Sequence, residues 1–288
     1  MSAVSIKHYL SLVKFSHTVF ALPFAIIGYF LGVDAIGTTP NWTLFAKVLL
    51  CMVFARSAAM GFNRYIDRTF DEQNARTAIR EIPAGVISPK SALLFVVLMS
   101  LAFIVTTWFI NPLCFFLSPI ALAVILGYSI TKRFTWLCHL VLGVGLSLAP
   151  IGAYLAVTGA FDWLPLFFSF AVLFWTAGFD IIYALQDEEF DRSQQLFSIP
   201  VWLGKKKALR LSEFLHGITA LFILAAGFYM QAGLFYWFGA AVFLTMLVYQ
   251  HSIVKPNDLS RVNLAFGTTN GIASVVLGIS YILEHFIS

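Results

Sequence analysis

The chain has 288 residues, of which 60% are hydrophobic and only 11% are charged. Because a soluble domain carries about a quarter charged residues, this composition excludes an ordinary soluble domain and predicts an integral membrane protein. The net charge of +4 follows the membrane topology described below and is no sign of nucleic-acid binding. The three cysteines lack the spacing of a zinc site, a haem attachment site or a disulfide framework.

Apolar windows of about 20 residues, the length that crosses a bilayer as a helix, recur along the whole sequence. They predict nine membrane-spanning helices, at about 16–33, 43–62, 92–110, 112–130, 136–157, 163–186, 213–230, 234–251 and 263–284. We therefore expect an all-α bundle that forms a single transmembrane domain over residues 1–288, with no soluble domain. The first apolar run has no small-residue cleavage site after it, so we expect it to be a retained span.

The basic residues predict the orientation of this bundle. If the N-terminus is cytoplasmic, every cytoplasmic connection carries Lys or Arg, whereas the connections on the other side, at about 34–42, 111, 159–162 and 231–233, carry none. This positive-inside distribution predicts a multi-pass protein of the cell (inner) membrane, with its N-terminus and its polar loops in the cytoplasm.

Two acidic motifs lie at the cytoplasmic ends of the second and sixth predicted spans. The first runs through Asn63, Asp67 and Asp71, and the second through Asp180, Tyr183, Asp187 and Asp191. On a helix, side chains at positions i and i+4 share one face, so each motif forms an acidic stripe. The first stripe extends back to Arg56, two turns earlier, and an arginine inside a span must pair or line a wet cavity.

Carboxylates that face one another across a cavity repel strongly at low dielectric unless cations are present. Mg²⁺ suits such a site because it binds through one or two carboxylates together with substrate phosphate oxygens. For one motif alone, a solvated helix end is an equal alternative. Two motifs, each leaving a span and flanked by basic residues, favour a site for Mg²⁺ and a diphosphate.

The two motifs are four helices apart, and each precedes a polar loop of about 20–30 residues that contains an Ile-Pro pair, Ile82-Pro83 or Ile199-Pro200. This correspondence predicts a duplicated four-helix unit with one extra helix. The loops suit a lid over the bundle, although their charge content favours ordinary solvated connectors. His17 and His139 are expected to be packing histidines rather than cavity residues.

The sequence resembles the UbiA superfamily of intramembrane aromatic prenyltransferases over nearly its whole length. The resemblance is carried by Asn63-x3-Asp67-x3-Asp71, Asp180-x2-Tyr183-Ala184-x2-Asp187-x3-Asp191, Arg56, Arg76-Thr77-x2-Arg80 followed by Gly85, and Tyr128-x2-Thr131-Lys132-Arg133. It is most similar to the 4-hydroxybenzoate polyprenyltransferase type. The stretch Arg80-Glu81-Ile82-Pro83 is more like the homologues assigned to menaquinone synthesis, so the aromatic acceptor stays open.

The resemblance implies a Mg²⁺-dependent transfer of a polyprenyl group from an allylic polyprenyl diphosphate to a 4-hydroxybenzoate-like or hydroxynaphthoate-like acceptor, in respiratory quinone biosynthesis. The implied Mg²⁺ ligands are Asp67, Asp71, Asp187 and Asp191, supported by Asn63. The implied substrate-binding residues are Arg56, Arg64, Arg68, Tyr128, Lys132, Arg133 and Tyr183. Asp180 is expected to position the acceptor or to help remove its ring proton. The expected partners are the two substrates and the lipid bilayer, with no nucleic acid and no obligate protein partner.

Other functions remain open from the sequence. Prenylation of a haem-type or chlorophyll-type acceptor is possible within the same superfamily. A cation-coupled secondary transporter is the alternative from a different class, but its acidic residues would be expected near the membrane midplane. The CDP-alcohol phosphotransferases also use spaced aspartates, but their Asp-Gly-x2-Ala-Arg opening is absent.

Overall fold

The computed structural model describes residues 6–14 and 20–287, and over these ranges it is all-helical, with a single isolated β-bridge between Lys255 and Asp258. The elements in chain order are α1 (Ile6–Leu12), α2 (Leu22–Ile36), α3 (Trp42–Ile66), α4 (Arg68–Gln73), α5 (Pro89–Trp108), α6 (Pro112–Thr131), α7 (Cys138–Thr158), α8 (Trp163–Ala184), the 3-10 turn η2 (Leu185–Asp187), α9 (Glu188–Ser193), α10 (Ile199–Tyr229), α11 (Leu234–Ile253), the π-helical turn η3 (Leu264–Thr269) and α12 (Asn270–Ile287).

Eight helices of the described chain are long and apolar enough to cross a membrane. They are α3, α5, α6, α7, α8 with its continuation through α9, α10, α11, and η3 continued by α12. The first predicted window, 16–33, corresponds to α2, whose 15 residues span about 22 Å. The start of that window and His17 both fall within residues 15–19, which are outside the described ranges. The expected all-α, multi-pass membrane fold is confirmed, with eight long helices and the shorter α2 in place of nine equal spans.

Helix starts follow from local chemistry. Ser88 and Asn111 each accept a hydrogen bond from a backbone N–H in the first turn of α5 and α6, and a proline follows each of them. A side-chain oxygen at the N-cap satisfies an otherwise unpaired N–H, and a proline at the first helical position loses no hydrogen bond. Asn41 caps α3 in the same way.

The seventh predicted window, 213–230, places the start of its helix too late, because α10 already begins at Ile199. The stretch between Ile199 and residue 213 contains the charged run Lys205–Lys207, whose low hydropathy is typical of a loop. The Ser198 side chain caps the new start, and the helix kinks at Gly204, whose φ of 74° and ψ of 159° are non-helical. The polar loop after the second motif is therefore much shorter than predicted.

The core is built around α8, which packs between α7 and α10. Its Trp175 is fully buried and contacts Phe24 and Phe243 at ring-centroid distances of 5.4 Å. Gly143 lets α7 approach α8 closely, since a Cβ at this position would lie only 2.4 Å from the Leu173 carbonyl oxygen. Small residues at such crossings are typical of membrane helix packing.

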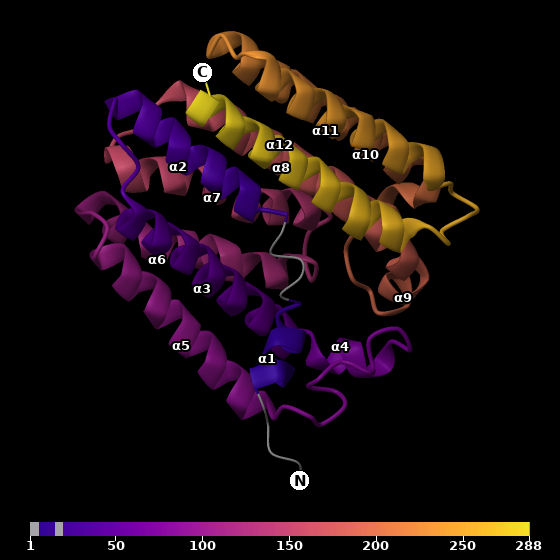
Figure 1. Cartoon of the computed structure of the whole chain (residues 1–288). Helices are drawn as coiled ribbons and strands as arrows, with labels where there is room; N and C mark the ends of the chain where they lie inside the picture. The colour runs from indigo at the N-terminus through magenta and orange to yellow at the C-terminus, as the bar shows by residue number, and fades with distance from the viewer. Residues whose placement is uncertain (1–5, 15–19, 288) are drawn as a thin grey trace.

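The helices that carry the acidic motifs, α3 and α8, finish at the same end of the bundle. Each is followed by a six-residue helix, α4 or α9, and Figure 1 shows both short helices projecting from that end. We call it the motif end. The α10–α11 turn and the C-terminus lie at the opposite end (Figure 1). The fold therefore brings together two segments that are more than 100 residues apart, while the internal repeat itself stays a prediction.

Candidate active site

The first motif occupies the last turn of α3 and the first turn of α4. The Asn63 side-chain amide donates to Asp67 Oδ2 at 2.9 Å, and Arg133 donates to Asp67 Oδ1 at 3.1 Å. Asp71 is buried on α4, where Arg80 donates to its Oδ1 at 2.6 Å. Each carboxylate of this motif therefore has a guanidinium partner, as buried charges require.

The second motif is linked directly to the loop that follows the first. Arg76 donates from Nε to Asp187 Oδ1 at 3.1 Å and from Nη2 to Asp187 Oδ2 at 2.5 Å. Its remaining Nη1 donates to the Tyr183 hydroxyl at 3.0 Å, and Asn74 adds a bond of 3.3 Å to Asp187 Oδ1. Burial would lower the pKa of Arg76, but the adjacent Asp187 carboxylate outweighs it and raises the pKa. This fork geometry is the strong form of an arginine–carboxylate pair.

Asp191, at the far end of the second motif, is only 1% exposed and forms an ion pair with Lys132 at 2.7 Å. Burial would lower the pKa of Lys132, but the Asp191 charge outweighs it and raises the pKa, so the ammonium stays charged. The Lys132 carbonyl also accepts the backbone N–H of Phe197 at 2.7 Å. The connection between α6 and α7 is thereby fastened to the start of α10.

Asp180 lies deeper, seven residues before Asp187 along α8, or about 10 Å along the helix axis. Its Oδ2 is 2.7 Å from His139 Nδ1, and the other ring nitrogen of His139 accepts the backbone N–H of Ile199 at 3.3 Å. His139, expected as a packing histidine, is thus buried but bonded to a candidate site residue.

The bundle also contains a cavity of about 370 Å³. Its walls come mainly from α3, α5, α6 and α7, and it extends from Arg56 and Tyr128 toward Phe161 in the connection that follows α7. Apart from Arg56 and Tyr128, the lining is almost entirely apolar. Tyr128 lies within electrostatic reach of Asp180, Asp67 and Arg64, so this part of the cavity wall is close enough to both motifs to be influenced by their charge.

Two arginines of α3 lack a counter-ion within the described chain: Arg56, which lines the cavity, and Arg64, eight residues further along the helix. Arg64 is only 6% exposed, and no ion pair is formed by Arg56 or Arg64 within residues 6–14 and 20–287. The Nε atoms of both side chains are buried and make no hydrogen bond there. Buried, unpaired guanidinium groups are costly, so these two residues favour an anionic ligand.

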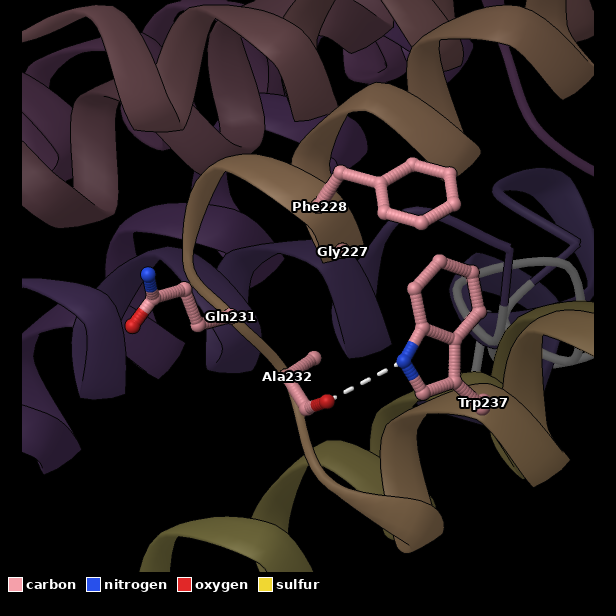
Figure 2. A pocket seen from close by; sticks show the side chains of 5 residues that line it. All are labelled: Gly227, Phe228, Gln231, Ala232 and Trp237. Carbon is pink, nitrogen blue, oxygen red and sulfur yellow. Dashed lines mark hydrogen bonds between the residues drawn. The ribbon is translucent and has the colours of Figure 1, made fainter.

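A second pocket, of about 410 Å³, lies between the end of α10 and the start of α11. Figure 2 shows its five lining residues, Gly227, Phe228, Gln231, Ala232 and Trp237, with the Trp237 indole N–H donating to the Ala232 carbonyl at 3.0 Å. None of the five has a titratable side chain. The pocket is at the end of the bundle opposite the motifs, so it takes no part in the candidate site.

The structure does not gather the four motif aspartates into one cluster. In the part of the chain that it describes, no three His, Cys, Asp or Glu side chains are grouped to hold a metal, and the carboxylates face Arg and Lys instead. Their chemistry nevertheless fits a hard divalent cation. Asp71 Oδ2 is buried without a hydrogen-bond partner in the described chain, and burial raises the pKa of Asp67 to about 6 despite Arg133. Both effects are those of carboxylates short of positive charge.

Most of the predicted site residues lie at the motif end, but Arg68 turns away from the carboxylates. It donates to the Tyr65 carbonyl at 2.6 Å and stacks over the Tyr65 ring at 4.6 Å. Sequence reasoning gave no site role to Arg76, Arg80 or His139. The two arginines were visible as part of the resemblance, whereas the sequence around His139 has no spacing that pairs it with Asp180.

Comparison with known proteins agrees with this geometry. Residues 21–275 match the profile of the UbiA prenyltransferase family. A 4-hydroxybenzoate octaprenyltransferase from Aliivibrio fischeri is 31% identical over 251 residues, which cover 86% of this chain and 85% of the relative. Another, from Vibrio campbellii, is 27% identical over 278 residues and covers 96% and 97% of the two chains.

Solved structures share the fold. The apo structure of a UbiA homolog from Aeropyrum pernix superposes with a TM-score of 0.84 at 29% identity, over 93% of this chain and 98% of that one. A UbiA homolog from Archaeoglobus fulgidus bound to GPP and Mg²⁺ gives a TM-score of 0.71 at 22% identity, over 96% and 99%. The chain belongs to the UbiA prenyltransferase family.

Proposed function

We propose that this protein transfers a polyprenyl group from an allylic polyprenyl diphosphate to a small aromatic acceptor, with Mg²⁺, at the motif end of the bundle. One observation carries the proposal. Two acidic motifs from the ends of α3 and α8 are joined through Arg76 and Asp187, and the wall of an apolar cavity contains Tyr128, which is within electrostatic reach of both motifs. The site thus combines a charged end for a diphosphate with an apolar space for an isoprenoid tail.

The charged end would hold the diphosphate. The residues that would bind Mg²⁺ are Asp67, Asp71, Asp187 and Asp191, with Asn63 fixing Asp67. When bound, Mg²⁺ neutralises the diphosphate as a leaving group. Four cations pair with these carboxylates in the structure, and each would bind phosphate oxygens instead when substrate and metal are present. They are Arg133, Arg80, Arg76 and Lys132. Arg64 is a further candidate for phosphate contact because it is buried and unpaired in the described chain, whereas Arg68 would first have to leave Tyr65.

In the reaction, the allylic C–O bond breaks and its electron pair leaves with the diphosphate. A new C–C bond forms to a ring carbon ortho to the acceptor's phenol hydroxyl, and that carbon then loses its proton. Asp180 is our candidate to position the acceptor or receive this proton, because it is within electrostatic reach of Tyr128 and lies deeper than the carboxylates that we propose as Mg²⁺ ligands. Tyr183, whose hydroxyl accepts a hydrogen bond from Arg76, lies between Asp180 and Asp187 in the sequence and is a further candidate for substrate contact.

Arg56 is the candidate for recognising the acceptor. It lines the apolar cavity, and its Nε has no partner in the described chain, so a carboxylate on the acceptor would supply the missing counter-ion. A 4-hydroxybenzoate-like or hydroxynaphthoate-like acid meets this need, and the similar octaprenyltransferases are named for 4-hydroxybenzoate. We place the activity in respiratory quinone biosynthesis on the same grounds.

The surface charge suggests the orientation. Lys and Arg are concentrated in the connections of the motif end, and the connections of the opposite end carry none. By the positive-inside rule, the motif end would face the cytoplasm from the inner membrane, and the chain would act there as one transmembrane domain.

The test uses membranes that contain the protein, supplied with Mg²⁺, a polyprenyl diphosphate and either 4-hydroxybenzoate or a hydroxynaphthoate. Product is expected with one of the two acids and should disappear on chelation of the metal. Asp67→Asn and Asp187→Asn should each abolish it, while a lipid-facing change, Gly217→Ala, should not. Lack of product with any phenolic acid from folded protein would contradict the proposed acceptor class.

A further inference from the structure

His139 connects Asp180 with the start of α10 through its two ring nitrogens. Its Nδ1 lies 2.7 Å from Asp180 Oδ2, and its Nε2 receives the Ile199 backbone N–H at 3.3 Å. The ring is only 2% exposed, so both contacts are made away from bulk water. Neither His139 nor Ile199 belongs to the acidic motifs, and the reaction described above leaves His139 without a role.

These two contacts fix the tautomer of the ring. A backbone N–H can only donate, so Nε2 must present a lone pair, and the ring hydrogen is on Nδ1. His139 therefore donates to the Asp180 carboxylate as a neutral imidazole, since an imidazolium would place an N–H against the N–H of Ile199. A hydrogen bond on the second nitrogen commonly sets which ring nitrogen carries the proton.

The bond to His139 occupies one oxygen of Asp180 and leaves the other without a protein partner. Within the described chain, Asp180 Oδ1 makes no hydrogen bond, and the Asp180 side chain is 24% exposed. The next residues along α8, Ile181 and Ile182, are fully buried. The Asp180 carboxylate is thus partly accessible between buried neighbours, and it lies within electrostatic reach of Tyr128 in the cavity wall.

We propose that His139 is a positioning residue for Asp180 in the aromatic prenyl transfer, an inference that rests on the proposed function. By donating to Oδ2, His139 fixes the orientation of the carboxylate and directs Oδ1 toward the acceptor. After the new C–C bond forms, the ring proton passes to Oδ1 as the ring regains its aromatic electrons, and Asp180 later returns the proton to water. Fixing such a group in place contributes to rate more than to substrate affinity.

A purely structural role for His139 is the competing explanation, but the junction between α7 and α10 has other ties. The Phe197 N–H donates to the Lys132 carbonyl at 2.7 Å, and Cys138 Sγ lies 3.6 Å from the Phe197 carbonyl oxygen. Trp136 also stacks on Trp202 at a ring-centroid distance of 5.4 Å. The junction should therefore survive the loss of one imidazole.

The test compares two amides at position 139 in the full-length protein. In His139→Asn the amide nitrogen takes the place of Nδ1 and keeps a donor for Asp180, whereas in His139→Gln the amide oxygen replaces Nε2 and keeps only the acceptor for Ile199. We expect His139→Gln to lower kcat by about 10- to 100-fold, by analogy with the loss of a residue that orients a metal ligand. His139→Asn should stay within about threefold of the wild type, and KM for the polyprenyl diphosphate should change little in either variant.

A double-mutant cycle separates positioning from packing. If His139 acts through Asp180, His139→Gln should cause no further loss of kcat in an Asp180→Asn background. An equal loss in both backgrounds, or loss of kcat in both amide variants together with a raised KM for the diphosphate, would overturn the inference while leaving the proposed function intact. Absence of aromatic prenylation by the wild type would overturn both.

A spectroscopic readout covers the case in which the variants do not fold. In wild-type protein labelled with ¹⁵N-histidine, the NMR signals of His139 should be those of the tautomer protonated on Nδ1. These signals can be assigned because they disappear in any variant at position 139 that folds, or by selective labelling. A neutral ring protonated on Nε2 would be incompatible with the Ile199 contact and would contradict the proposal without reference to activity.

Discussion

Arg76, in the loop that follows the first acidic motif, donates two hydrogen bonds to Asp187 of the second motif, of 3.1 Å from Nε to Oδ1 and 2.5 Å from Nη2 to Oδ2. The two residues are 111 positions apart in the sequence. A guanidinium fork matches a phosphate as well as it matches a carboxylate. In the proposed function, Arg76 would neutralise Asp187 in the absence of substrate and would bind the diphosphate once Asp187 binds the metal.

Arg76→Lys should weaken use of the polyprenyl diphosphate, because a lysine keeps the charge but loses the two-point geometry. Hydrogen bonds to charged groups contribute about 1.5–3 kcal/mol, so kcat/KM for the diphosphate should fall by about 10- to 100-fold. The measurement is steady-state kinetics with the diphosphate varied at saturating acceptor. Arg210→Lys is the matched control, since Arg210 is exposed on α10 and belongs to neither motif. Equal losses in the two variants would contradict the special place of Arg76.

The acidic site should bind Mg²⁺ more weakly below about pH 6. Burial raises the pKa of Asp67 to about 6, with Asp71 adding to the rise and Arg133 opposing it. A protonated carboxyl cannot bind metal, so below this pKa the apparent affinity should fall about tenfold for each pH unit. The stabilisation of the protein by Mg²⁺, measured as a shift in thermal midpoint in detergent, should be large at pH 7.5 and small at pH 5.

The same raised pKa gives an effect of opposite sign in protein without metal. The unfolded carboxyl ionises near 3.8 and the folded one near 6, so the folded state binds the proton more tightly. This group therefore lowers the free energy of unfolding as the pH rises between these values. Asp67→Asn should remove both pH effects, and a Mg²⁺ shift that stays constant from pH 7.5 to pH 5 in the wild type would contradict the assignment.

Filling the cavity should change which isoprenoid chains are accepted. Gly145 lines the cavity on α7, about 10 Å along the helix from Cys138 at the motif end, and a Cβ there meets nothing closer than 3.6 Å. Gly145→Phe should therefore fold while blocking the deeper part of the apolar space. Relative rates with a two-unit and an eight-unit allylic diphosphate should shift toward the short donor. Gly217→Phe on α10 enters open space outside the cavity and serves as the control. Loss of both donors to the same degree would argue that the tail lies elsewhere.

The crossing of α7 and α8 should not tolerate a methyl group. Gly143→Ala would place its Cβ 2.4 Å from the Leu173 carbonyl oxygen, whereas Gly152→Ala on the same helix meets nothing within 4 Å. Overpacking of this kind costs about 1–3 kcal/mol. Thermal unfolding in detergent should show a lower midpoint for Gly143→Ala only. Equal thermal midpoints for Gly143→Ala and Gly152→Ala would contradict this prediction, because they would mean that α7 and α8 can move apart at little cost in stability.

Hydropathy and charge predicted the membrane fold because they depend on composition over whole helices. Windows such as 112–130 and 163–186 match α6 and α8 closely, since both are apolar throughout and begin after a capping side chain. The start of α10 was missed because Lys205–Lys207 are polar, and only the capping bond from Ser198 reveals the earlier helix. Local chemistry outweighs hydropathy at such boundaries.

The site was predictable where spacing along one helix sets it and unpredictable where the fold brings distant residues together. Asp67 and Asp71 are four residues apart, and this spacing alone predicts that their side chains share one face of a helix. The partners of the motifs come from elsewhere in the chain, as with Arg76 at Asp187 and His139 at Asp180. No period or spacing in a single sequence encodes those contacts.

Calorimetric binding of a non-reactive polyprenyl diphosphate analogue, with and without Mg²⁺, tests the central claim most directly. Our account predicts tight binding by the wild type only with Mg²⁺, and loss of that binding in Asp67→Asn and in Asp187→Asn, because each substitution removes a carboxylate from one of the two motifs. The Glu213→Gln variant, altered at a carboxylate on α10 outside both motifs, should bind as the wild type does. Binding that is equally tight without metal, or that survives in both aspartate variants, would contradict a metal–diphosphate site built from the two motifs.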